Sequence, residues 1–222
     1  MKKLFIQSVS RGIRTLIFPP TCMNCGSPNF DICVACKKLL RPKPRFLMGE
    51  NFPIASSLSY GEVTGKLLLL AKENGLVSAQ KFFANALVTS INHFKIEYPI
   101  TIVPIPSQRK SVRRRGFDSM KEIAKFILQD PDLKTDIELE EALKITRPVS
   151  DQSSLSEEER YRNLDKALRV NNARTSKAIL VIDDVITTGS TLREAIRALK
   201  ERNLTVIGAA TACATQRRLA IE

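Results

Sequence analysis

The sequence predicts an α/β fold, a doubly wound parallel sheet preceded by a small metal-binding module. Apolar stretches typical of strands alternate with amphipathic stretches typical of helices, which favours a parallel sheet with helices on both faces. The run at 178–182 is continuously apolar and rich in β-branched residues, as in a strand covered on both faces. Two closely spaced cysteine pairs precede these elements. We therefore expect a helical lead and zinc finger in residues 1–45 and the sheet domain in residues 46–222.

The first part of the sheet domain is expected to hold a strand, two helices, a second strand and a third helix. Residues 56–75 read as a short strand, a turn and a helix, and residues 78–96 as an amphipathic helix with apolar residues three or four positions apart. The apolar strand at 100–107 ends at prolines. A basic loop at 108–120 then leads to a helix at 121–129.

The second part begins with a short strand, a polar loop and a charged helix within residues 142–168, where Ser156 is a candidate N-cap. Two further strands, at 177–184 and 204–214, flank a helix at 192–200. Cys213, in the last strand, is expected to be a small buried core residue.

The composition fits a globular chain with polyanionic partners. Of the 222 residues, 43% are hydrophobic and 26% are charged, and the formal net charge is +12. His93 is the single histidine. No nucleophile pattern accompanies it, so we expect a solvated helix residue and no histidine-dependent catalysis.

The first twenty residues carry charged and polar side chains within their apolar stretch, including Gln7, Arg11 and Arg14. This pattern excludes a signal-peptide core and a membrane span. It predicts an amphipathic helix that packs on the protein, the alternative being a helix on a membrane surface. We therefore expect a cytoplasmic protein.

Cys22 and Cys25 form one CxxC pair, and Cys33 and Cys36 form another. Two such pairs in close succession are typical of a tetrahedral structural zinc site, in which each turn presents two thiolates. Disulfides would need an oxidising compartment, and the sequence shows no targeting evidence for one. Redox CxxC chemistry and a degenerate empty site are two further interpretations of the same spacing.

Asp183 and Asp184 follow the buried strand, where open α/β sheets leave a crevice for ligands. The turn from Thr187 to Thr191 then opens a helix, and a helix start suits an anion. Two carboxylates would repel a bare phosphate, but the hydroxyls of a ribose 5-phosphate could donate to them. The alternative is a strand end with a capped turn.

This stretch resembles the motif of type I phosphoribosyltransferases, which bind phosphoribosyl pyrophosphate (PRPP). The resemblance implies that Asp183 and Asp184 bind the ribose and that the following turn binds the 5′-phosphate. It implies a pyrophosphate loop from Ser107 to Gly116, with Arg115 and Lys72 as cations beside the reacting centre, and magnesium held mainly by ligand and water oxygens. The residues implied in the turn are Val185, Thr187, Thr188, Gly189, Ser190 and Thr191.

The order of motifs is similar to that of the ComF family, including the ComFC and GntX types. These motifs are CxxC-x7-CxxC, a YxG turn with a downstream lysine, VPIP followed by RRGF, QxxLSxxERxxN, and DDVITTGST. Members join a zinc finger to a phosphoribosyltransferase-type domain and are associated with DNA uptake in natural transformation. The resemblance implies single-stranded DNA as a partner, along with DNA-uptake machinery such as a helicase.

The basic run contains Arg109, Lys110, Arg113 and Arg114, which form either a solvated face or a nucleic-acid contact. We expect a PRPP-binding protein that acts in DNA uptake. The alternatives are an active phosphoribosyltransferase of nucleotide metabolism with an unidentified acceptor, and a purine-salvage transferase. The sequence does not decide whether PRPP is turned over.

Two further features concern the site implied by the resemblance. The family segment with Arg147, Gln152, Arg160 and Asn163 is expected to close over the site as a hood. Where relatives commonly read RGFNQ, this chain has Asp118 and Ser119 in place of the two amides. Asp118 is then a candidate N-cap for the next helix.

Overall fold

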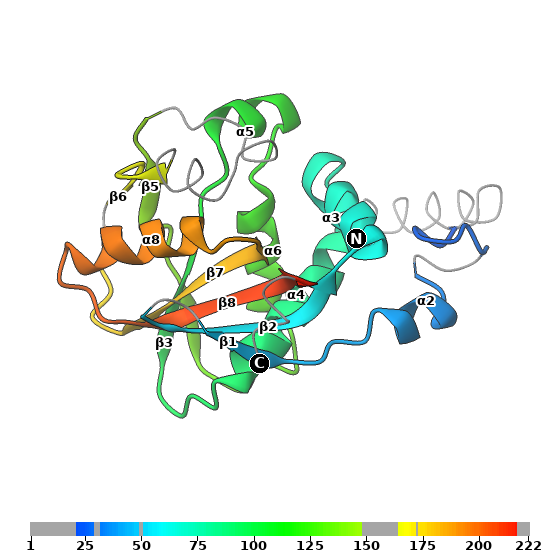
Figure 1. The fold of residues 1–222 in the computed structure, drawn as a ribbon, viewed down its shortest axis with the longest axis horizontal. Coiled ribbons are helices and arrows are strands. Elements are labelled where there is room, and N and C mark those ends of the chain that lie inside the picture. The colour runs from blue at the N-terminus through cyan, green and yellow to red at the C-terminus, as the bar shows by residue number, and fades with distance from the viewer. Residues whose placement is uncertain (1–20, 29–31, 49–50, 148–163, 172, 217–222) are drawn as a thin grey trace, which may run out of the picture. The chain divides into compact units, whose positions relative to one another are not determined.

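The computed structural model describes residues 21–28, 32–48, 51–147, 164–171 and 173–216 (Figure 1). The predicted lead helix and the hood residues Gln152, Arg160 and Asn163 lie outside these ranges, as does Ser156. The chain divides into two compact units, Met1–Arg41 and Pro42–Glu222. Residues just after this division already belong to the sheet domain, because the Lys43 amide donates to the Ser57 carbonyl at 2.7 Å.

The described residues of the first unit contain one helix, α2 (Val34–Leu39). In chain order, the described residues of the second unit form β1 (Arg45–Met48), β2 (Pro53–Tyr60), α3 (Glu62–Glu73), α4 (Val77–His93), β3 (Ile100–Pro104), α5 (Arg109–Arg115), α6 (Ser119–Ile127), β4 (Ile137–Leu139), β5 (Leu143–Ile145), β6 (Leu168–Val170), β7 (Ala178–Ile186), α8 (Ser190–Lys200) and β8 (Val206–Thr215). Across all these described segments, no helix is both long enough and apolar enough to span a bilayer.

The predicted parallel sheet is confirmed. Within the described residues its strand order is β1-β2-β8-β7-β3-β4, with β7 and β8 near the centre (Figure 1). Neighbouring strands from β2 to β4 run parallel, whereas β1 pairs antiparallel with β2 at one edge. This antiparallel edge was not predicted. Strands β5 and β6 form a separate antiparallel pair.

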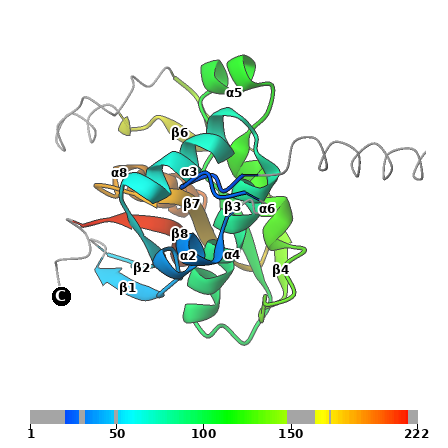
Figure 2. The same cartoon turned by 90° about the vertical axis from the view of Figure 1, so that its right-hand side faces the viewer.

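Helices cover both faces of the sheet, as expected of a doubly wound fold. Helix α4 packs against β2, β8 and α6, while α8 packs against β7, β8 and β6 (Figure 2). Ile179 and Val181 of β7 belong to the buried cluster that contains Ala195 and Leu199 of α8. Because side chains alternate along a strand, Leu180 and Ile182 point to the opposite face, and all four are fully buried.

Two predicted segments differ from the structure. The basic loop is largely helical, since α5 spans Arg109–Arg115, and arginine and lysine are good helix formers. Gly116 ends α5 in the left-handed conformation (φ 81°), and its N–H donates to the Val112 carbonyl at 2.8 Å. The helix expected at 192–200 begins two residues earlier, at Ser190.

Candidate functional site

The four paired cysteines lie together in the first unit. Their Sγ atoms are all within 4.8 Å of one another, and the Cys25 and Cys33 sulfurs are 3.6 Å apart. All five cysteines of the chain, Cys213 included, are free of disulfides. Cys33 is also the N-cap of α2, so the helix start fixes the second pair.

This cluster fits a structural zinc ion. Four thiolates at a Zn–S distance of about 2.3 Å would lie about 3.8 Å from one another, close to the separations observed. Backbone N–H groups already point at the sulfurs, as when Cys33 N–H donates to Cys22 Sγ at 3.3 Å. Burial opposes ionisation of Cys22, but the N–H groups of Cys25, Cys33 and Asn24 lower its pKa to about 6. Four sulfur ligands leave no open position for catalysis.

Asp183 and Asp184 lie near the carboxyl end of β7, which continues through Val185 and Ile186. The pairing with β8 extends to the same point, with Val185 opposite Cys213. Successive side chains of a strand point to opposite faces, so the two carboxylates have different neighbours.

Asp184 is 3% exposed and is paired with Lys72 at the end of α3, with 2.6 Å between Lys72 Nζ and an Asp184 carboxylate oxygen. Burial tends to lower the pKa of Lys72, but the charges of Asp184 and Asp183 outweigh it and raise this pKa above its ordinary value. Lys72 therefore remains a cation beside both carboxylates.

Asp183 has no lysine of its own. Loss of hydration, followed by the neighbouring charge of Asp184, raises the pKa of Asp183 to about 8, although Lys72 partly opposes the shift. Thr211 of β8 is in register with Asp183, and Ser56 of β2 is in register with Thr211. Both hydroxyls are buried and lack a hydrogen-bond partner among the described residues. Among the described residues, the row that contains Asp183 is thus short of polar partners.

The turn after β7 leads directly into α8. Its N-cap is Gly189, whose φ of 84° lies in the left-handed region, and no side chain caps the helix there. The Thr188 and Ser190 hydroxyls bond each other at 2.9 Å. The Ser190 amide also donates to the Thr188 hydroxyl at 3.4 Å, and the first amides of α8 together form the positive end of the helix dipole.

Glu73 connects α3 to the end of α5, a role that the sequence did not indicate. It accepts from Arg115 at 3.2 Å and from Arg114 at 2.5 Å. The Arg115 side chain is only 6% exposed and lies over the Phe117 ring. The residue before Glu73, Lys72, binds Asp184, so the last turn of α3 contacts both regions expected to bind PRPP.

Gly75, just after α3, allows the end of this helix to pack closely against the Phe117 ring. A Cβ at this position would come within 3.1 Å of two carbon atoms of the Phe117 ring, and the backbone there has φ 62°. A glycine directly after LLLLAKEN predicts a helix end, but the sequence does not predict its contact with Phe117.

Ser107 is held by Asp118. Its N–H and hydroxyl donate to the two Asp118 carboxylate oxygens at 3.1 Å and 2.9 Å. Asp118 also accepts from the Met120 amide at 3.1 Å and is the N-cap of α6, as predicted. Asp118 thus connects Ser107, which precedes α5, to the start of α6, which follows it.

Helix α5 separates the predicted basic residues into two groups. Arg114 and Arg115 are paired with Glu73. Arg109, Lys110 and Arg113 are exposed, and within the described ranges none of them has an ion-pair partner. Three exposed cations of this helix thus have no acidic partner in the part of the chain that the structure describes.

Comparisons with known proteins agree with these features. Residues 111–220 match the model of the phosphoribosyl transferase domain. The chain is 24% identical over 202 residues to "DNA utilization protein YhgH" of Escherichia coli K12, covering 87% of this chain and 84% of that protein. It is 24% identical over 189 residues to "Competence protein F" of Haemophilus influenzae, covering 82% and 79%.

Two solved structures are also similar in part. A hypoxanthine phosphoribosyltransferase from Staphylococcus aureus aligns with a TM-score of 0.34 and 15% identity, covering 63% of this chain and 65% of that one. Adenine phosphoribosyltransferase from Leishmania tarentolae aligns with a TM-score of 0.38 and 11% identity, covering 78% and 94%.

Proposed function

Because this chain is ComF-like and carries a phosphoribosyl transferase domain over residues 111–220, we propose that it binds PRPP and contacts single-stranded DNA during DNA uptake. The main support is the end of β7, where Asp183 and Asp184 precede a turn with Gly189 in the left-handed conformation. We also propose a partner in the DNA-uptake machinery, such as a helicase.

Each part of the site has a distinct task in binding PRPP. Asp183 and Asp184 accept hydrogen bonds from the ribose hydroxyls, and the first turn of α8 receives the 5′-phosphate. Arg115 and Lys72 supply positive charge on the side of the pyrophosphate. Magnesium, when bound, neutralises pyrophosphate oxygens and needs few protein ligands. The orphaned hydroxyls of Ser56 and Thr211 are consistent with a polar ligand or water beside Asp183.

Titration of the full chain with PRPP and magnesium tests this site. Asp183→Asn is expected to weaken PRPP binding by about 10- to 100-fold, because a hydrogen bond to a charged group contributes about 1.5–3 kcal/mol. Asp183 is preferable to Asp184 for this test because Asp184 holds Lys72. The matched control is Asp132→Asn at an exposed position. Equal affinities for both variants would contradict the proposal, and pyrophosphate release in the same samples would identify turnover.

The affinity for PRPP is also expected to depend on pH. With a pKa of about 8, Asp183 keeps its proton at neutral pH, whereas hydroxyl donors favour the ionised carboxylate. Binding below a pH of about 8 must therefore release a proton, so affinity should rise between pH 6 and 8 and level off above. Calorimetry across this range measures the change, and a flat profile in both wild type and Asp183→Asn would exclude this linkage.

Contact with DNA is supported by the three exposed cations of α5 and by the names of the relatives. Replacing Arg109, Lys110 and Arg113 with glutamine should weaken single-stranded DNA binding and make it less sensitive to salt. Each phosphate that the protein no longer neutralises reduces the slope of log K against log salt by about 0.7 for single strands. Arg114 and Arg115 are unsuitable for this test because they bind Glu73.

The matched control replaces three exposed lysines, Lys125, Lys134 and Lys200, with glutamine and removes the same charge. Fluorescence anisotropy with a labelled oligonucleotide at several salt concentrations compares the two proteins. Equal slopes for the two triple variants would show that α5 does not contact the phosphates.

A further inference from the structure

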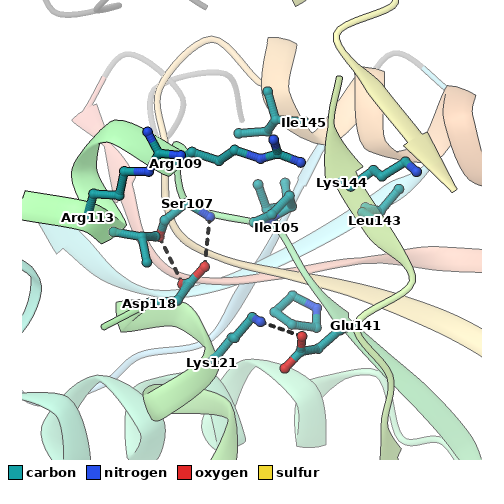
Figure 3. Close-up of a pocket in the computed structure, with 13 residues that line it drawn as sticks. Ile105, Ser107, Arg109, Arg113, Asp118, Lys121, Glu141, Leu143, Lys144 and Ile145 are labelled. Carbon is teal, nitrogen blue, oxygen red and sulfur yellow. Dashed lines mark hydrogen bonds and ion pairs between the residues drawn. The ribbon is translucent and has the colours of Figure 1, made fainter. Parts of the chain in front are cut away.

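A cavity of about 360 Å³ lies beside α5, between the end of β3 and strand β5 (Figure 3). Its lining includes Ser107, Arg109 and Arg113, so it belongs to the loop expected to bind pyrophosphate. A second cavity of about 360 Å³ lies between β6 and the C-terminal end of α8. This volume is within the range of small-molecule sites, about 300–1,000 Å³. We call it the α8–β6 cavity, and its lining residues are Lys166, Arg169, Val170, Arg197, Ala198, Glu201 and Arg202.

The α8–β6 cavity is distant from the residues proposed to bind PRPP. That proposal uses the first turn of α8, which begins at Ser190, whereas the cavity is lined by α8 only from Arg197 onward. Because an α-helix rises about 1.5 Å per residue, the two ends of α8 are about 15 Å apart. Strand β6 runs alongside α8 and supplies the opposite wall (Figure 1). None of the lining residues lies in β7, in the turn after it or in the loop from 107 to 116.

Arg197 holds the two walls of this cavity together. Its guanidinium donates to the buried Glu194 at 2.6 Å and 2.8 Å and to the Leu168 carbonyl at 3.1 Å. Glu194 in turn accepts from the Leu168 amide at 3.0 Å, which fixes β6 against α8. Arg197 also pairs with Glu201, a carboxylate of the lining. The charge of Glu201 is therefore compensated, and it opposes an incoming anion less.

Three further cations of the lining are unpaired. The side chains of Lys166, Arg169 and Arg202 are exposed and have no hydrogen-bond or ion-pair partner among the described residues. The negative end of the α8 dipole explains a cation at Arg202, but Lys166 and Arg169 come from β6 and the turn before it. After Arg197, the charges of these two residues lower the pKa of Glu201, so both lie near its carboxylate. Two elements of the chain thus bring positive charge to one cavity, whose lining has a net charge of +3.

Lys166 has an unusual backbone conformation. Its φ of 52° lies in the left-handed region, which L side chains disfavour and glycine adopts without strain. A lysine here is therefore less favourable for the fold than a glycine, yet it places an ammonium group at the cavity. Replacing it can separate a role in binding from a role in stability.

The lining suits phosphate groups better than an apolar molecule. Val170 and Ala198 are its apolar residues, and none of its residues is aromatic, so it offers no surface on which a base can stack. The guanidinium groups of Arg169 and Arg202 present paired N–H donors, which match phosphate oxygens. Three unpaired cations exceed the charge of one phosphodiester. A chain of phosphates compensates them better than a single group.

We propose that the α8–β6 cavity binds consecutive phosphate groups through Lys166, Arg169 and Arg202. The phosphates belong either to the backbone of single-stranded DNA or to a free polyphosphate. In the first case the inference rests on the proposed DNA contact, to which the cavity adds a second point of attachment beyond α5.

Fluorescence anisotropy of the full chain with a labelled thymidine oligonucleotide tests the DNA strand as the source. Arg169→Gln combined with Arg202→Gln should weaken binding at least tenfold at low salt. It should also reduce the slope of log K against log salt by about 1.4, because each lost phosphate contact removes about 0.7. The matched control, Lys134→Gln with Arg174→Gln, removes the same charge at exposed positions outside the cavity and should leave the slope nearly unchanged. Equal slopes for the two double variants would exclude DNA as the ligand of the cavity.

Calorimetry with tripolyphosphate in magnesium-free buffer tests the phosphate chemistry without DNA. The cavity variant should bind tripolyphosphate at least tenfold more weakly than the control variant. Equal binding of tripolyphosphate by the two would overturn the proposal. An oligonucleotide that displaces tripolyphosphate identifies the DNA strand as the source, and failure to displace it identifies the free polyphosphate.

Lys166→Gly provides a test that is independent of any loss of folding. It should weaken tripolyphosphate binding at least threefold without lowering the urea midpoint of the chain. Unchanged binding with a lower midpoint would show that Lys166 serves the fold and not a ligand.

Failure of this site is distinguishable from failure of the proposed DNA contact. If only the α5 variant weakens DNA binding, and both double variants bind tripolyphosphate equally, the DNA contact stands and the cavity site fails. If no oligonucleotide binds but tripolyphosphate binds through Arg169 and Arg202, the DNA contact fails while the cavity site stands.

Discussion

Removing the metal from the four-cysteine cluster is expected to unfold the described part of the first unit and leave the sheet domain folded. Structural zinc sites contribute about 10–16 kcal/mol of binding energy at neutral pH, which in small modules is the energy of folding. The described residues of the first unit contain one short helix, and the N-cap of that helix, Cys33, is itself one of the four cysteines. Metal analysis should find about one zinc ion per chain by the four-thiolate count.

The variant for this test is Cys22→Ser combined with Cys25→Ser. It should lose the metal and become sensitive to proteolysis within residues 21–41, with the sheet domain still protected. Cys213→Ala is the matched control, because it removes a cysteine that lies outside the cluster. Retention of zinc in the double variant, or its loss in the control, would contradict the assignment.

Lys72→Met is expected to destabilise the sheet domain by about 3 kcal/mol at neutral pH, the lower end of the range for breaking a buried ion pair. The Asp184 side chain is 4% exposed and would lose its cation, whereas Lys72 itself is 33% exposed, which lets some water reach the site. Because the pKa of Lys72 is raised above its ordinary value, the lysine is charged throughout the range from pH 5 to pH 8, and the loss of stability should be similar at both.

The control for Lys72 lies on the same helix. Lys66 pairs with Glu62 at 2.8 Å, but both of these side chains are more than half exposed, and such pairs contribute about 0–1 kcal/mol. Lys66→Met removes the same charge from α3 and should have little effect. Urea unfolding of the two variants at pH 5 and pH 8 provides the comparison, and similar losses for both would show that the Lys72 pair does not stabilise the fold.

Local patterns predicted the features that depend on neighbours in the sequence. The apolar run of β7 predicted a central strand, and the cysteine spacing predicted the cluster. The N-cap role of Asp118 was also predictable, because capping joins residues two or three positions apart.

Features that depend on distant partners were not predictable. The basic run at 109–115 was expected to lie in a loop, but it forms α5, and Glu73 from α3 pairs with two of its arginines. The antiparallel edge strand β1 is defined by its register with β2, since the four residues RFLM carry little pattern of their own. The cavity beside α5 likewise needs β5, which lies far along the chain from β3.

The link between Asp118 and Ser107 has a consequence for anion affinity. An internal carboxylate already occupies the amide and hydroxyl of Ser107, which a phosphate oxygen would otherwise use. If pyrophosphate binds this loop as we propose, it must compete with Asp118 for the two Ser107 donors. We therefore expect free pyrophosphate to bind this loop weakly, and a ligand that also contacts the end of β7 to bind it more tightly.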